Sequence, residues 1–199
     1  MRYLYFLSIL NSCLLALPIF YFLTKNNLKT AINQACVILI VLYGILECFY
    51  GLISKIHLLY LADTCLLVGS LIIFPVSLKN RTNNFISNPV ISAIIIFVFL
   101  LGTSIINNIL HTTFLITSLI YYYGIMTIAH IYQNIIKKGS HIAVSMLTAS
   151  LIICFIYDTL YYSGRITLQQ YNLAPWYIQY ILQSTSGLLC LYNLKKQNA

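Results

Sequence analysis

Three acidic side chains are the residues best suited to chemistry in this sequence, because each lies within or against a long apolar stretch. Glu47, Asp63 and Asp158 are the only acids among the 199 residues. A charged side chain inside the hydrocarbon of a membrane costs roughly 2.5 to 3.5 kcal/mol on insertion scales. These acids are therefore candidates for a functional site, and Asp158 in LIICFIYDTLYYSGR is the clearest of them.

Proton transfer is the chemistry that paired buried acids perform. The loss of water favours the neutral form of a carboxyl group, and a second acid nearby favours it further. One member of a pair can then donate a proton as general acid while its partner accepts one as general base. The same pair also suits a proton or cation relay in a small transporter or membrane sensor, and the sequence does not separate the two roles.

A purely structural role is the alternative for each acid, since an intramembrane carboxyl can pair with a Lys, a Tyr or an amide of a neighbouring helix at roughly 1 kcal/mol per contact. This alternative is strongest for Glu47, which we expect near the end of its span and within reach of water. Asp63 and Asp158 share an Asp-Thr pair, in which the Thr hydroxyl can form a local hydrogen bond.

Metal and retinal chemistry find less support. A zinc-dependent hydrolase would use Glu47, His57, Asp63 and His111, but such families carry an HxxxH pair on the last span, and residues 175–194 contain no His. The same stretch lacks an interior Lys for a Schiff base. We expect His130 and His141 to pack or to lie at an interface. The six cysteines form no CxxC pair, so we expect buried packing.

The composition requires a membrane around these residues. The chain is 60% hydrophobic and only 7% charged, whereas a soluble domain is about 25% charged. Because the apolar stretches are about 20 residues long, we expect an all-α polytopic transmembrane helix bundle, with residues 1–199 as one transmembrane domain. The eleven cations are scattered between the apolar stretches, so the net charge of +8 does not indicate a nucleic acid partner.

Seven spans account for the hydropathy pattern. Polar or Pro-containing segments such as TKNNLK, SLKNRTNNFISNP and SGRITLQQYNLAP separate them. An eighth span results if the region 58–88 is split. The predicted spans are 3–23, 30–50, 58–77, 89–107, 112–133, 142–163 and 175–194.

The distribution of cations predicts the orientation of these spans. Eight of the eleven cations fall on one face of a seven-span bundle and three on the other. The positive-inside rule then places the N-terminus outside and the C-terminus in the cytoplasm. The larger group contains Lys25, Lys29, Lys79, Arg81, Lys137, Lys138, Lys195 and Lys196, and the smaller contains Arg2, Lys55 and Arg165.

This orientation brings the three acids to one depth, toward the outer face. The same layer receives other polar side chains: Lys55, His57, His111, Arg165, Tyr180 and Gln183. The positions along the spans therefore predict that the acids share one layer of the membrane, although position alone does not show that they meet around the bundle axis.

The order of these features resembles the YhhN-like lysoplasmalogenase family, small polytopic enzymes that hydrolyse the vinyl ether of lysoplasmalogens. The likeness is strongest over residues 119–194. It is carried there by TSLIYYYGIMTIAH, SMLTASLIICFIYDTLYYSGRI and WYIQYILQSTSG, and in the N-terminal half more loosely by YGLISKIHLLYLADTCLL. The sequence departs from the family in three ways: Tyr157 replaces the small residue before Asp158 and Ala62 the Gly before Asp63, no Pro follows Lys25 or Lys29, and seven rather than eight spans are predicted.

The resemblance implies that Asp63 and Asp158 are the catalytic carboxylates and that Lys29 and Gln183 contact the substrate. We also expect Tyr157 and Arg165, which flank Asp158, to contact the substrate, although Arg165 equally suits the end of a span. Vinyl ether hydrolysis needs a protonated acid and an ionised one, so it requires no metal or cofactor. The expected partner is a membrane lipid, and the expected location is a bacterial inner membrane.

Overall fold

A computed structural model of the chain describes residues 2–28, 30–53, 56–78, 112–136, 140–162, 165 and 175–197. Every regular element in these ranges is an α-helix. The helices are α1 (Arg2–Lys25), α2 (Ala31–Ile53), α3 (Ile56–Leu78), α5 (Thr112–Ile135), α6 (Ser140–Tyr162) and α8 (Pro175–Lys196). Six of the seven predicted spans therefore coincide with helices, with ends that differ by at most three residues. The predicted span 89–107 lies outside the described residues.

Four of the described helices are long and apolar enough to cross a membrane: Phe6–Lys25, Ala31–Ile53, His57–Leu78 and His141–Asp158. The prediction of a helical membrane protein is confirmed at this level, whereas the count of seven spans is not. Helix α8 matches the others in length but carries more polar residues. In α8 these face inward, since Gln179, Gln183 and Ser186 are buried.

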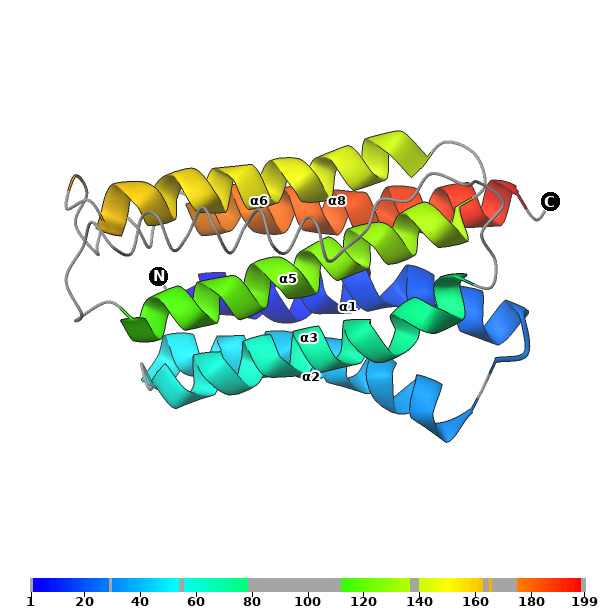
Figure 1. Ribbon diagram of the computed structural model, residues 1–199, viewed down its shortest axis with the longest axis horizontal. Helices are drawn as coiled ribbons and strands as arrows, with labels where there is room; N and C mark the ends of the chain where they lie inside the picture. The colour runs from blue at the N-terminus through cyan, green and yellow to red at the C-terminus, as the bar shows by residue number, and fades with distance from the viewer. Residues whose placement is uncertain are drawn as a thin grey trace.

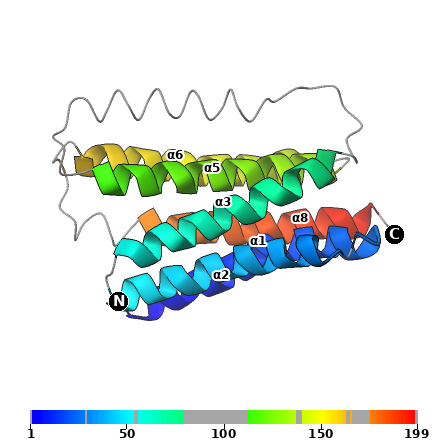
Figure 2. The same cartoon turned by 60° about the horizontal axis from the view of Figure 1, so that its bottom comes forward.

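The six described helices form a ring in which each one packs against its neighbours in chain order, and α8 closes the ring against α1. Helices α1, α3, α5 and α8 run in one direction along the bundle, and α2 and α6 run in the other (Figure 1). The N-terminus and the C-terminus therefore lie at opposite ends, which Figure 2 shows from a second direction. Helices α1 and α5 also touch across the ring.

Close approach of α1 to its neighbours depends on two glycines. A Cβ atom on Gly44 of α2 would lie 2.4 Å from the Ser8 carbonyl oxygen, and one on Gly187 of α8 would lie 2.2 Å from that of Leu14. The Ser8 hydroxyl donates a 2.8 Å hydrogen bond to the Gly44 carbonyl. Small residues that allow such approach are characteristic of helix packing in membranes, where lipid provides no hydrophobic drive between helices.

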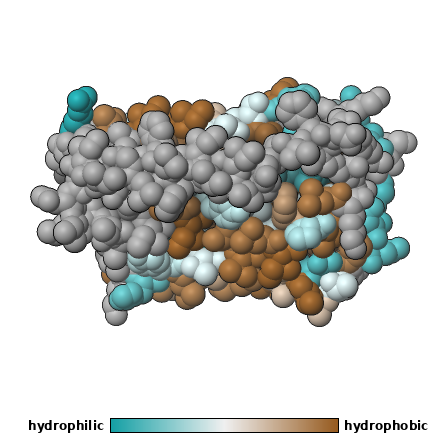
Figure 3. Space-filling view, viewed as in Figure 1, coloured by the Kyte–Doolittle hydropathy of each residue, from teal (hydrophilic) through white to brown (hydrophobic). Residues whose placement is uncertain are grey.

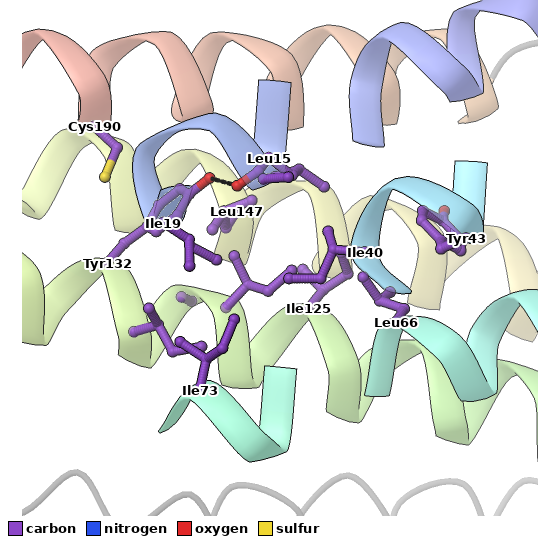
Figure 4. Close-up of a cluster of buried hydrophobic side chains, with 14 of the residues drawn as sticks. Leu15, Ile19, Ile40, Tyr43, Leu66, Ile73, Ile125, Tyr132, Leu147 and Cys190 are labelled. Carbon is purple, nitrogen blue, oxygen red and sulfur yellow. Dashed lines mark hydrogen bonds between the residues drawn. The ribbon is translucent and has the colours of Figure 1, made fainter. Parts of the chain in front are cut away.

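The core lies inside this ring. Its largest fully buried members are Leu15 and Ile19 of α1, Ile40 and Tyr43 of α2, Leu66 and Ile73 of α3, and Ile125, Ile128, Ile131 and Tyr132 of α5 (Figure 4). The Tyr132 hydroxyl donates a 2.7 Å hydrogen bond to the Leu15 carbonyl, which joins α5 to α1. The polar atom of this buried phenol therefore has a backbone partner.

The outer surface of the helices is also apolar. Ile32, Ile38, Ile142 and Ile181 each expose more than 60% of their surface, and apolar residues occupy much of the described face in Figure 3. A surface of this kind is unfavourable in water but matches lipid. Together with the four apolar helices, it indicates a membrane-embedded protein.

Candidate functional site

The three acids lie at the same end of the bundle, on three different helices. Glu47 is in the last third of α2, Asp63 is seven residues into α3, and Asp158 is four residues before the end of α6. Because α2 and α6 end where α3 begins, these positions share one layer (Figure 1). Each acid is only 3% exposed.

The acids also meet around the bundle axis. Asp63 lies within electrostatic range of both Glu47 and Asp158. The three side chains reach this position from consecutive sides of the ring, because α3 packs between α2 and α5, and α5 packs against α6. The expected common layer is therefore confirmed, and the ring adds the lateral convergence that the sequence left open.

Tyr122 of α5 contacts one of the acids directly. Its hydroxyl donates a hydrogen bond to Oδ2 of Asp158, and its side chain is 2% exposed. A buried hydrogen bond between a phenol and a carboxyl group is strong, since water does not compete for either group. Asp158 is thus held in place by α5 rather than directed toward lipid.

Glu47 lies among phenols. Its carboxyl group is next to the hydroxyls of Tyr43 and Tyr180, yet among the described residues Glu47 Oε2 and the Tyr43 hydroxyl have no partner that satisfies hydrogen-bond geometry. The expectation that Glu47 reaches water is wrong, because Tyr43 and Tyr180 lie against its carboxyl group and the side chain is buried. A buried carboxyl oxygen without a partner is rare and costly.

A network of amides and hydroxyls continues from the acids toward the middle of the bundle. The Tyr121 hydroxyl accepts hydrogen bonds from Nε2 of Gln179 and of Gln183. Oε1 of Gln183 accepts a 2.7 Å hydrogen bond from Asn11 on α1. Tyr121 also lies within electrostatic range of Glu47 and Asp63. The network therefore connects the acids with α1, α5 and α8.

The four residues expected to contact the substrate do not all lie beside the acids. Gln183 is fully buried and belongs to the amide network, whereas Tyr157 is half-buried on α6. Arg165 is exposed, and its backbone N–H donates to the Leu160 carbonyl at 2.9 Å, which caps the end of α6. This contact fits the alternative in which Arg165 ends the span. Lys29 lies outside the described residues.

The residues of the zinc alternative do not assemble within the described part of the chain. No group of three or more His, Cys, Asp and Glu side chains there could hold a metal ion. His57 is exposed on α3, and His111 lies outside the described residues. His130 is buried and its ring packs edge-on against Phe74, as expected for a packing residue.

Five of the six cysteines are buried, in agreement with their expected packing role, but Cys13 is exposed. Cys154 differs from the others because its thiol donates to Oε1 of Gln179. It also lies within electrostatic range of Asp158 and Glu47. Cys154 is therefore part of the polar cluster rather than of the apolar core.

The sequence did not single out five members of the site, which are Tyr43, Tyr121, Tyr122, Asn11 and Gln179. The tyrosines were expected to be interfacial or packing residues, since a phenol suits both. One signal was available: an Asn, two Gln and a Tyr-rich run recur at the level of the acids in spans that are otherwise apolar. Polar residues at a common depth in several spans indicate an internal polar cluster.

No family model matches the chain, and no curated protein or solved structure shows significant similarity to it.

Proposed function

We propose that the protein is an intramembrane lipid hydrolase that cleaves the vinyl ether of lysoplasmalogen-like lipids by general acid and base catalysis at Asp63 and Asp158. The observation that carries this proposal is the convergence of the two carboxyl groups, buried and within electrostatic range, in a membrane-embedded bundle. The resemblance to lysoplasmalogenases supports the choice of substrate.

The chemistry suits such a site. Protonation of the vinyl carbon produces a cationic, oxocarbenium-like centre, and water then adds to it. A neutral carboxyl supplies the proton, and an ionised carboxyl both stabilises the cation and accepts a proton from the water. A buried location strengthens these interactions because the effective dielectric constant there is low.

The orientation is part of the proposal. Lys25 at the end of α1 and Lys195 and Lys196 at the end of α8 lie at the end of the bundle opposite the acids. By the positive-inside rule this end faces the cytoplasm, so the acids lie toward the outer face of a bacterial inner membrane and the N-terminus is outside.

Isosteric replacement of each aspartate tests the activity. We expect Asp63→Asn and Asp158→Asn to lower the rate of aldehyde release from a lysoplasmalogen about 10²- to 10⁴-fold, the usual contribution of a general acid or base. The measurement uses the purified full chain in lipid nanodiscs. Tyr132→Phe is the control, since it alters a buried polar side chain away from the acids. Full activity in both aspartate variants would refute the hydrolase.

A proton-coupled transporter or sensor is the second candidate. The observation that favours it is the third buried acid, Glu47, which the hydrolytic reaction does not require and whose Oε2 has no partner in the part of the chain described. Proton-driven uptake into liposomes that is abolished by Asp158→Asn, without lipid hydrolysis in the wild type, would establish this function instead.

A further inference from the structure

The two aspartates of the proposed site have different surroundings. Asp158 accepts a hydrogen bond from the Tyr122 hydroxyl. The ionisable groups that interact with Asp63 are two other acids, Glu47 and Asp158. The two aspartates act on each other equally, so the described difference between them is that Asp158 accepts a hydrogen bond from Tyr122, whereas Asp63 has the second acid Glu47 beside it.

This difference decides which aspartate holds a proton. A hydrogen bond donated to a carboxylate stabilises its ionised form, and nearby carboxylates oppose ionisation. When two acids share a site, the one whose surroundings favour the neutral form acts as the general acid. The proton of the pair therefore belongs on Asp63.

We propose that Tyr122 is a positioning residue that keeps Asp158 ionised as the proton acceptor and thereby leaves Asp63 as the acid that protonates the substrate. This inference rests on the proposed function, and it assigns separate roles to the two aspartates. Tyr122 acts through Asp158, so it does not have to touch the substrate.

The assignment closes the catalytic cycle without any other reactant than water. The Asp63 proton forms a new C–H bond at the vinyl carbon remote from the ether oxygen, and the π electrons of the double bond supply that bond. Water then forms a C–O bond at the cationic carbon and gives a proton to Asp158. In the collapse of the hemiacetal, Asp63 takes the hydroxyl proton and Asp158 protonates the leaving glyceryl oxygen. The products are an aldehyde and an alcohol, and both aspartates return to their starting states.

Five other ionisable groups of the described part of the cluster come from the neighbouring helices, and none of these five is a cationic side chain. They therefore do not replace the hydrogen bond that Tyr122 donates to Asp158. They are Glu47 of α2, Asp63 of α3, Tyr121 of α5, Cys154 of α6 and Tyr180 of α8.

The pH profile of Tyr122→Phe tests the positioning role. We expect kcat/KM at neutral pH to fall about tenfold to a hundredfold, the value of a hydrogen bond to a charged group. We also expect the acidic limb of the profile to move to higher pH, because a carboxylate that loses a donated hydrogen bond gains its proton more readily. The matched control is Tyr132→Phe on the same helix, which loses a buried phenol bonded to a backbone carbonyl and should leave the profile in place.

A second measurement does not depend on activity or on the folding of the Tyr122 variant. A protonated carboxyl group has an infrared carbonyl band that a carboxylate lacks. We expect this band to weaken in Asp63→Asn at neutral pH and to be unchanged in Asp158→Asn. The opposite pattern would overturn the assignment of roles.

The outcomes separate this inference from the proposed function. If the aspartate variants are inactive but Tyr122→Phe has the wild-type pH profile, the positioning role is wrong and the hydrolase stands. If both aspartate variants hydrolyse the lipid at the wild-type rate, the hydrolase itself is wrong.

Discussion

The two ends of the bundle are formed by the same helices but differ in the side chains that they bury. At the end that contains Lys25 and Lys196, the interior consists mostly of apolar side chains such as Ile19, Ile73 and Leu147 (Figure 4), with a few polar ones such as Ser77 and His130. At the other end, the acid-bearing end, the interior contains three carboxyl groups together with phenols and amides. We call the first the apolar end.

Two tyrosines on α5 illustrate the difference between the two ends of the bundle. At the apolar end Tyr132 donates to the Leu15 carbonyl, a bond that a helical backbone offers at any position. At the acid-bearing end Tyr121 accepts from two glutamine side chains, which requires α5 and α8 to supply matching partners. A polar network of this kind is costly to bury and is not needed to hold helices together, since the described contacts at the apolar end are isolated ones, such as that between Asn134 and Ser77. This comparison supports a functional role for the acid-bearing end.

The largest expected effect comes from transferring an acid to the apolar end. Ile73 is fully buried and lies ten residues after Asp63 on α3. We expect Ile73→Asp to destabilise the protein by about 5 kcal/mol or more, since it combines a buried charge with the loss of a core side chain. The measurement is the yield of folded protein and its thermal unfolding in detergent.

Ile73→Val is the control for that variant, with an expected cost of about 1 kcal/mol. If Ile73→Asp proves as stable as Ile73→Val, then the two ends tolerate acids equally and the comparison fails.

The tyrosine pair gives the next largest effect. Tyr121→Phe leaves the buried Gln179 amide without its acceptor and the Gln183 amide with only a 3.3 Å hydrogen bond to Ser150, so we expect a loss of about 2 to 4 kcal/mol. Tyr132→Phe removes one bond to a carbonyl, and we expect about 0.6 kcal/mol, the average for a hydrogen bond between membrane helices. Thermal unfolding of the two variants under identical conditions measures the difference in stability. Equal losses would show that the network contributes no more to stability than a single hydrogen bond.

The smallest expected effect is the difference in stability between alanine substitutions at two glycines, Gly187 and Gly124. A Cβ at Gly187 would lie 2.2 Å from the Leu14 backbone oxygen, whereas one at Gly124 would first meet the Leu66 side chain at 3.0 Å. Because a side chain can move more readily than a helix backbone, we expect Gly187→Ala to cost about 1 to 3 kcal/mol and Gly124→Ala to cost less. Unfolding temperatures in the reverse order would contradict the close approach of α8 to α1.

The helices could be predicted from the sequence because each is encoded locally, by an apolar run of spanning length that ends in polar residues or near Pro. The layer of the acids followed from counting residues along successive spans. The count of seven spans stays a prediction, since the predicted span 89–107 lies outside the described residues and α8 holds polar residues that face the interior. Hydropathy averages over a helix and cannot tell an inward Gln from an outward one.

Glu47 illustrates where the prediction failed. Its position near the end of α2 suggested access to water, but Tyr43 and Tyr180 enclose it. Burial of a residue at the end of a helix depends on which side chains the neighbouring helices bring, and Tyr180 is 133 residues away in the chain. No local pattern contains that information.

What the sequence alone determined is a helical, membrane-embedded chain with three acids at one depth, since span length and residue depth are properties of a single helix in lipid. The tertiary structure decided that the helices form a ring in chain order, and this ring brings Asp63 between Glu47 and Asp158 and places Tyr122 against Asp158. The rotation of each helix about its axis is fixed by packing against its neighbours. The partners of each buried acid therefore became visible only in the assembled bundle.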